Sequence, residues 1–134
     1  MLQIIAIIFF AAAIFALCEM NTRRIMLRYV ERACTGSKWR RRFPDASKSE
    51  IREFLDIFIE AFGFKQCWRL CFTPEDRVMD VYRTLYPIRG VPDGMELESL
   101  VKDLQKRYRV DIFNSWREDI TLADLFMQTR RPAP

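Results

Sequence analysis

The stretch Asp93 to Ile112, DGMELESLVKDLQKRYRVDI, decides the fold that we expect for this chain. Its apolar residues recur at helical spacing and fall within one narrow arc: Leu97, Leu100, Val101, Leu104 and Tyr108. Asp93 can cap the first turn, and Glu96 and Glu98 place negative charge at the positive end of the helix dipole. The pattern predicts a central amphipathic helix that begins with acidic residues and packs one face on a small core.

Two more amphipathic helices flank the central one. Ser47 and Glu50 form an S-x-x-E capping box, after which a helix is expected to end near Gly63. The apolar stripe of that helix consists of Ile51, Phe54, Leu55, Phe58 and Phe62. Near the C-terminus, Thr121 and Asp124 begin a last helix. Its inward residues are expected to be Leu122, Leu125 and Phe126.

A shorter helix is predicted between the first two. The segment Thr73-Pro74-Glu75-Asp76 has the pattern of a helix start, because proline suits the first helical position. Its apolar face would consist of Val78, Val81, Tyr82 and Leu85. Helical periodicity in all of these segments predicts an all-α domain over residues 45–129, followed by a short tail over residues 130–134.

The N-terminal segment differs from everything that follows. Residues 1–18 contain Gln3 as the only strongly polar side chain, and 18 apolar residues can just cross a hydrocarbon core of about 30 Å. A cleaved signal peptide, with its cleavage site near Ala11 to Ala13, is the alternative. It is disfavoured because no Lys or Arg precedes the apolar run and the run continues past that site. We therefore predict a retained, single transmembrane helix.

Charge is distributed unevenly after this helix. Residues 20–42 hold eight Lys or Arg against Glu31, whereas residues 45–128 hold 12 basic and 16 acidic side chains. The positive-inside rule predicts that the N-terminus lies outside and the acidic domain faces the cytoplasm, at the inner membrane of a bacterium. We interpret residues 19–44 as a basic juxtamembrane neck on anionic lipid. Its lipid-facing residues are predicted to be Arg23, Arg24, Arg28, Arg32, Lys38, Trp39, Arg40, Arg41 and Arg42.

Nucleic acid is the alternative partner of the neck, because Lys38 to Arg42 interleaves an aromatic ring with positive charge. Beside a membrane helix, topology and lipid contact explain the charge better, so we expect no nucleic acid. The four cysteines Cys18, Cys34, Cys67 and Cys71 form no C-x-x-C pair and no zinc-type spacing. We interpret them as small core residues that stay reduced in the cytoplasm, and we expect no metal site.

The order of helices over about residues 47–129 resembles acyl carrier proteins. In that family an Asp-Ser-Leu triplet opens the second helix, and its serine carries a phosphopantetheine arm. The corresponding triplet here is Asp93-Gly94-Met95, and the segment Asp119 to Leu125 is similar to the end of carrier domains. The resemblance implies a carrier-like helical bundle whose attachment position, Gly94, has no hydroxyl, so that no cofactor is expected. An unrelated helical bundle is the alternative.

The sequence favours a non-catalytic binding module over an enzyme. The chain has no histidine and no glycine-rich phosphate loop. A carrier-like domain without its arm would keep an acidic helix on which partner proteins dock. We therefore predict a module that recruits or regulates a protein at the cytoplasmic membrane face, through Asp93, Met95, Glu96, Glu98 and Asp103. The alternative is a small structural subunit of a membrane complex, unrelated to carrier proteins.

Overall fold

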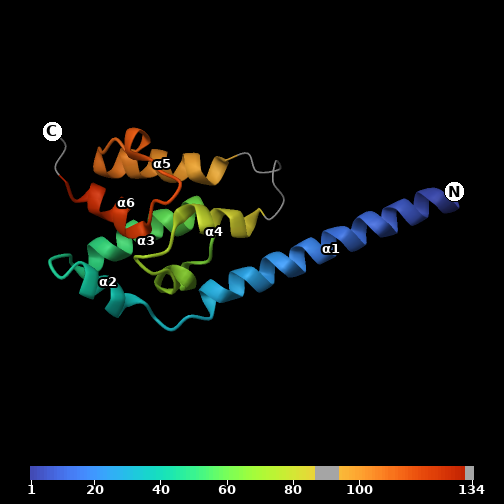
Figure 1. Cartoon of the computed structure of the whole chain (residues 1–134), viewed down its shortest axis with the longest axis horizontal. Helices are drawn as coiled ribbons and strands as arrows, with labels where there is room; N and C mark the ends of the chain where they lie inside the picture. Colours follow the sequence, from blue (N-terminus) through green and yellow to red (C-terminus); the bar gives the residue numbers. More distant parts are fainter. Residues whose placement is uncertain (87–93, 132–134) are drawn as a thin grey trace.

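The computed structural model describes residues 1–86 and 94–131, and within these ranges the regular structure is helical, with no β-strand. The α-helices are α1 (Leu2–Val30), α2 (Gly36–Arg42), α3 (Lys48–Ala61), α4 (Val78–Leu85), α5 (Met95–Tyr108) and α6 (Leu122–Thr129). Two short 3-10 helices are η1 (Gln66–Cys71) and η2 (Phe113–Ser115). Figure 1 shows α1 projecting from a bundle formed by the shorter helices, with the N-terminus at its free end. The expected all-α fold with one long apolar N-terminal helix is confirmed.

The first helix is continuous through the expected boundary at residue 18. Its N-terminal part is exposed, whereas Met26 is 8% exposed and belongs to the core, with Tyr29 and Val30 packed against it. These residues lie where α1 packs on α4 and η1. The apolar side of the neck therefore covers the folded domain. This corrects the prediction that it lies along lipid.

The segment after α1 also belongs to the domain. The backbone N–H of Thr35 donates to the carbonyl of Leu70 (2.8 Å), and the Trp39 indole N–H donates to the carbonyl of Phe72 (2.9 Å). Trp39 is fully buried. The prediction that Trp39 faces lipid is therefore wrong, and the domain begins near Met26 rather than after Pro44. Tertiary contacts decide this, because an indole ring beside basic residues has the same local pattern at a membrane surface and in a core.

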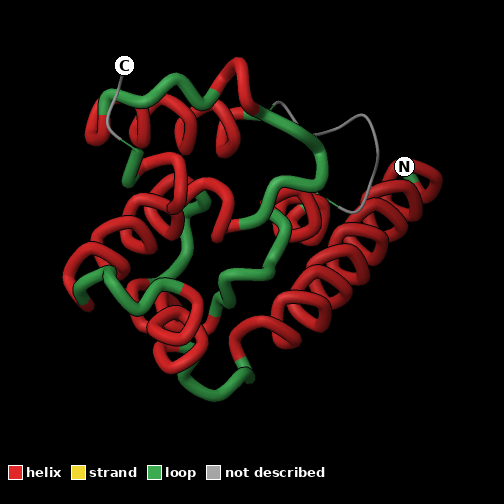
Figure 2. The backbone as a smooth tube through the Cα atoms, turned by 60° about the vertical axis from the view of Figure 1, so that its left-hand side comes forward, coloured by secondary structure: helices red, strands yellow, loops and turns green. Residues whose placement is uncertain are grey.

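The core is rich in aromatic rings, and α3 runs through it. Both hydrogen bonds of the Ser47–Glu50 capping box are present, and α3 ends at Ala61, followed by the C-cap Phe62 and by Gly63 at φ +68°, near the predicted end. Phe54 on α3 lies 6.1 Å from the ring of Trp39 and 5.3 Å from that of Phe126 on α6. Figure 2 shows how loops join these short helices around a common centre. The core thus combines rings from α2, α3 and α6.

The start of α4 differs from the prediction. The helix begins at Val78, whereas Thr73 to Asp76 forms a turn in which the Asp76 carboxylate accepts the Thr73 N–H (2.7 Å). The backbone then pairs with the start of α6, since Val78 N donates to Ile120 O (3.1 Å) and Leu122 N donates to Asp76 O (2.9 Å). This pairing with the start of α6 holds the backbone of residues 76–78, so α4 begins only at Val78 and Pro74 lies in the preceding turn. Local sequence does not contain that information.

The central and last helices follow their patterns closely. On α5, Leu100 and Leu104 are fully buried, and the other three residues of the predicted stripe are partly buried against the core. The helix begins at Met95 after Gly94 and ends at Tyr108, before the expected Ile112. The Thr121–Asp124 capping box of α6 is present, and the predicted inward residues Leu122, Leu125 and Phe126 are buried. The predicted cap at Asp93 lies outside the described residues.

Candidate functional site

The start of α5 is the first candidate site, because the predicted partner-binding residues lie there. Met95 is 62% exposed, and Glu98 and Asp103 are also exposed. Glu98 forms an i,i+4 ion pair with Lys102 (2.7 Å). These three predicted residues are accessible to a partner, while Asp93 lies outside the described residues.

Glu96 does not share this exposed position. Its carboxylate accepts a hydrogen bond from the Tyr86 hydroxyl at the end of α4, and the side chain is half-buried. The neighbouring Gly94 N–H donates to the Tyr82 hydroxyl (3.1 Å). Two tyrosines of α4 thus hold the first turn of α5. The prediction that Glu96 is an exposed partner contact is corrected, because this carboxylate joins two helices. Sequence reasoning placed Tyr82 only in the core and gave Tyr86 no role.

The charge of α5 is balanced along its length. Its three carboxylates, Glu96, Glu98 and Asp103, are matched by Lys102, Lys106 and Arg107. The acidic residues are concentrated in the first turn and the basic residues in the last, as the helix dipole favours. Helix stability alone therefore accounts for much of this charge pattern. A docking partner would meet a mixed surface with a short acidic end.

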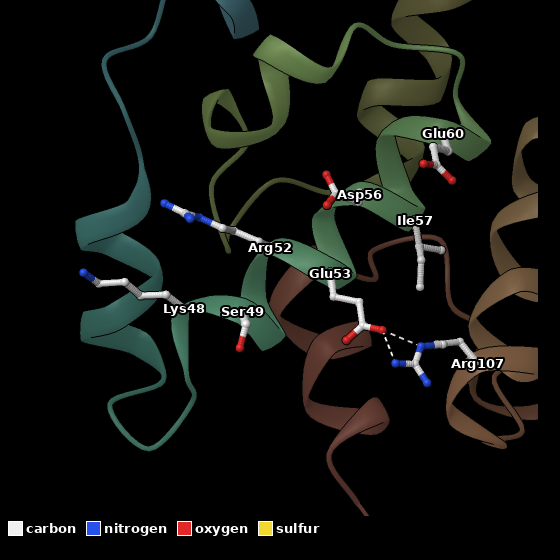
Figure 3. A pocket seen from close by; sticks show the side chains of 8 residues that line it. All are labelled: Lys48, Ser49, Arg52, Glu53, Asp56, Ile57, Glu60 and Arg107. Atoms are coloured by element: carbon white, nitrogen blue, oxygen red, sulfur yellow. Dashed lines mark hydrogen bonds and ion pairs between the residues drawn. The ribbon is translucent and has the colours of Figure 1, made fainter.

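A shallow groove of about 820 Å³ runs along α3 beside the end of α5 (Figure 3). Its lining residues are Lys48, Ser49, Arg52, Glu53, Asp56, Ile57, Glu60 and Arg107. Glu53 forms an ion pair with Arg107 across the groove, and Asp56 accepts two hydrogen bonds from Arg69 (both 2.9 Å). Three basic and three acidic side chains line this groove, so its charges compensate each other.

Tyr108 lies beside this groove at the contact of α5 with α3. Burial of the ring, with a smaller contribution from the negative charge of Glu53, raises the pKa of Tyr108 to about 12. A phenol with so high a pKa stays protonated at neutral pH and does not act as a base there. The groove arrangement therefore fits packing between two helices rather than acid–base chemistry.

The basic residues predicted to face lipid occupy three different surroundings. Arg23, Arg24 and Arg28 are exposed on α1. Arg32 forms an ion pair with Asp76 (2.6 Å) and stacks over the Tyr29 ring, 4.7 Å from its centroid. Arg32 therefore fastens the end of α1 to the turn before α4, which corrects its assignment to lipid.

The remaining basic residues of the neck lie on α2. Lys38, Arg40, Arg41 and Arg42 are all exposed. Figure 1 shows α2 at the end of the bundle that is far from the N-terminal part of α1. With α1 upright in a bilayer, α2 would lie away from the membrane surface next to residue 18. The arrangement therefore supports lipid contact for the basic residues of α1 more than for those of α2.

Two further predicted features have a definite place in the structure. Gly94, at the attachment position of the carrier resemblance, has φ +75° and precedes the first residue of α5. Cys34 and Cys67 are exposed, and Cys18 and Cys71 are half-exposed, so the prediction that the cysteines are core residues is wrong. Among residues 1–86 and 94–131, no group of three or more Cys, Asp or Glu is placed to hold a metal ion.

Comparisons with protein-family models, with curated proteins and with solved structures found no match to this chain. The resemblance to acyl carrier proteins therefore stays a prediction from residue patterns. Three features of the molecule bear on its function: the exposed apolar part of α1, the accessible start of α5 and the charged surfaces of α2 and α3.

Proposed function

We propose that this chain is a membrane-anchored, non-catalytic helical module that recruits or regulates a protein partner at the cytoplasmic face of a bacterial inner membrane. The observation that carries the proposal is the division of α1. Its N-terminal part presents uncovered apolar side chains, while its C-terminal part is packed into the domain. One continuous helix thus joins a surface suited to lipid to a folded domain.

The exposed part of α1 supports an anchor on energetic grounds. The large apolar residues of this part that are more than half exposed are Leu2, Ile4, Ile5, Ile7, Ile8, Phe9, Phe10, Phe15 and Leu17. Fully removing one such side chain from water is worth about 1.5–3 kcal/mol, so leaving all of them in water is strongly unfavourable. The helix is long and apolar enough to cross a membrane. Arg23 and Arg24 follow on its exposed side, where the positive-inside rule retains them in the cytoplasm.

Topology reporters test the anchor and its orientation. A C-terminal fluorescent-protein fusion should fluoresce, a C-terminal alkaline phosphatase fusion should be inactive, and the protein should resist alkaline extraction from membranes. Active phosphatase, or a mature chain that starts near Ala13, would contradict the proposal. The second result would identify α1 as a cleaved signal instead.

The carrier-like interpretation is supported by the two capped helices around α5 and by the position of Gly94 before its first turn. Without a hydroxyl at this position, a broad-specificity phosphopantetheinyl transferase should leave the intact mass of the protein unchanged. The Gly94→Ser variant tests the analogy, since no atom of the described residues outside its chain neighbours lies within 4 Å of the added Cβ. The positive φ costs the serine about 1 kcal/mol, which the domain must tolerate. Modification of the unaltered chain would refute the non-carrier interpretation.

The proposed partner surface consists of Met95, Glu98 and Asp103. Reversing Glu98 and Asp103 to Lys should change the melting temperature little, because exposed charges contribute about 0–1 kcal/mol per pair. A basic partner should then associate more slowly and bind more weakly. Recovery of native neighbours from detergent extracts by the wild type and this variant gives the measurement. A Glu118→Lys/Asp119→Lys variant, exposed but distant in sequence, is the matched control. Equal recovery of native neighbours by all three proteins would contradict the proposal and would mean that this face of α5 is only solvated.

The structural-subunit alternative would be favoured by exposed aromatic surface on the domain. Of the three tryptophans that could supply it, Trp39 is fully buried, and Trp68 and Trp116 are partly buried against the core. Phe113 is 77% exposed. A single exposed ring is a small contact area for a permanent subunit. The recruiting module is therefore the function that we favour.

A further inference from the structure

We propose that the cavity between α2 and the start of α3 binds the phosphate group of a small, water-soluble phosphate monoester. This cavity has a volume of about 290 Å³. It is lined by Cys34, Gly36, Ser37, Arg40, Lys48, Ile51, Arg52 and Leu70. The inference does not depend on the proposed partner recruitment, because none of these residues lies on α5.

Three cations line the cavity, and no acidic side chain does. Arg40, Lys48 and Arg52 are exposed, and none of them has an ion-pair partner among the described residues. Other basic residues of the domain, such as Arg32, Arg69 and Arg107, have carboxylate partners, whereas these three cations share one cavity without any. Like charges held together repel each other, and a bound anion would remove that repulsion.

The carboxylates of α3 near this cavity have other partners: Glu50 accepts the backbone N–H of Ser47 (2.7 Å), and Glu53 and Asp56 pair with arginines. Glu53 is held by Arg107 and Asp56 by Arg69, so neither neutralises the cations next to them in sequence. Figure 3 shows Lys48 and Arg52 extending together toward α2, on the side of α3 away from the Glu53–Arg107 pair. Lys48 and Arg52 line both the groove and the cavity, and Arg40 adds a third positive charge on the cavity side.

The chemistry of the lining suits a phosphate. Guanidinium groups bind phosphate oxygens through paired N–H donors, an ammonium adds a point charge, and the Ser37 hydroxyl can donate a further hydrogen bond. Buried Ile51 and partly buried Leu70 contribute apolar wall without competing acceptors. The positive field is reinforced by α2, which has four basic and no acidic side chains.

The volume of the cavity and its place in the bundle favour a small soluble molecule over a lipid or a nucleic acid as the carrier of the phosphate. Pockets for drug-sized ligands have volumes of about 300–1,000 Å³, so this cavity fits a phosphate with a small carrier such as a sugar. A lipid of the anchoring bilayer would have to reach α2, which lies at the far end of the bundle from the N-terminal part of α1 (Figure 1). Single-stranded nucleic acid would use aromatic rings for stacking, and no ring is among the described lining residues.

The test is calorimetric titration of the full-length protein in phosphatidylcholine nanodiscs with glucose 6-phosphate, at about 0.15 M salt so that diffuse charge effects are screened. Saturable binding is expected, with competition by inorganic phosphate and no binding of glucose. The triple variant Arg40→Gln/Lys48→Gln/Arg52→Gln should bind at least about tenfold more weakly. The matched control, Lys38→Gln/Arg41→Gln/Lys106→Gln, removes the same charge outside the cavity and should stay within about twofold of the wild type.

The outcomes separate the alternatives. Failure of the wild type to bind either glucose 6-phosphate or inorganic phosphate overturns the proposal. Equal weakening in both triple variants, with unchanged thermal melts, also overturns it, because the binding would then reflect net charge alone. In nanodiscs enriched in phosphatidic acid the affinity should be unchanged, and loss of glucose 6-phosphate binding there would assign the cavity to a lipid headgroup instead.

Discussion

The two parts of α1 both carry apolar side chains, but these side chains lie in opposite surroundings. Met20 is 63% exposed, whereas Met26, less than two turns further along the same helix, is 8% exposed and packed in the core. The N-terminal part has apolar residues on all sides, as a helix in lipid requires, while residues 26–30 pack on α4 and η1. The difference teaches that a basic amphipathic segment after an apolar helix can be a docking element of the domain rather than a lipid-binding strip.

The largest expected effect is at Trp39, where the docked segment enters the core. Trp39→Ala removes a fully buried ring and its hydrogen bond to Phe72 O, and it should destabilise the domain by about 3–5 kcal/mol. Urea unfolding of the full chain in detergent micelles, followed by far-UV circular dichroism, measures the change. Arg41→Ala on the exposed side of the same helix is the control. A loss below about 1 kcal/mol would mean that Trp39 is not a core residue.

Met26 and Met20 provide a matched pair within one helix. Met26→Ala should cost about 2 kcal/mol, because it leaves a cavity against the domain. Met20→Ala should leave the free energy of domain unfolding unchanged, since its side chain contacts no part of the core. The same unfolding measurement applies to both variants. Equal losses in the free energy of unfolding would contradict the assignment of Met26 to the packed part of α1 and of Met20 to its exposed part.

Arg32 and Arg28 compare a paired with an unpaired cation at the end of α1. Arg32→Gln should destabilise the domain by about 1 kcal/mol, because it removes the ion pair with Asp76 and the contact with the Tyr29 ring. Arg28→Gln should have no measurable effect on unfolding, but it should weaken binding to anionic vesicles if this residue faces lipid. If the two variants lose vesicle binding equally without any loss of stability, Arg32 is a lipid contact after all.

The smallest effect on stability is expected at Tyr108, and it appears only at alkaline pH. Because this residue lies on α5, it serves as a reference remote from α1. Its pKa is raised from 10.0 to about 12, so folding favours the protonated phenol. That contribution is complete below pH 10 and is lost as the pH rises from 10 to about 12, because only the unfolded chain then releases the proton readily. Tyr108→Phe should equal the wild type near neutral pH and lose less stability across this alkaline range. Identical alkaline unfolding curves would contradict the raised pKa.

The predictions from sequence succeeded where the signal was local. The capping boxes at Ser47 and Thr121 lie within four consecutive residues, so both helix starts were recognised. The buried stripe of α5 follows from periodicity alone. Predictions failed where two distant segments pair. The turn at Asp76 depends on α6, and the role of Glu96 depends on Tyr86.

The cavity between α2 and the start of α3 also depends on contacts between distant segments, so local sequence does not predict it. Sequence reasoning noticed Arg40 to Arg42 as a run of charge but attached no function to Lys48 or Arg52. Those two cations come together with Arg40 only because α2 packs beside the start of α3, while the following carboxylates Glu53 and Asp56 pair with Arg107 and Arg69. The positions of these three residues in the sequence do not show that they line one cavity.

The amino-acid sequence by itself determined the helical class, the apolar N-terminal helix and the limits of α3 and α6, because these depend on interactions between residues at most a few turns apart. Only the tertiary structure decided which apolar faces meet protein. An apolar stripe specifies burial but not its partner, since the hydrophobic effect is non-directional and lipid or core satisfies it equally. The packing of α4, η1 and α3 therefore determines that the side chains of Met26 and Trp39 are buried in the protein.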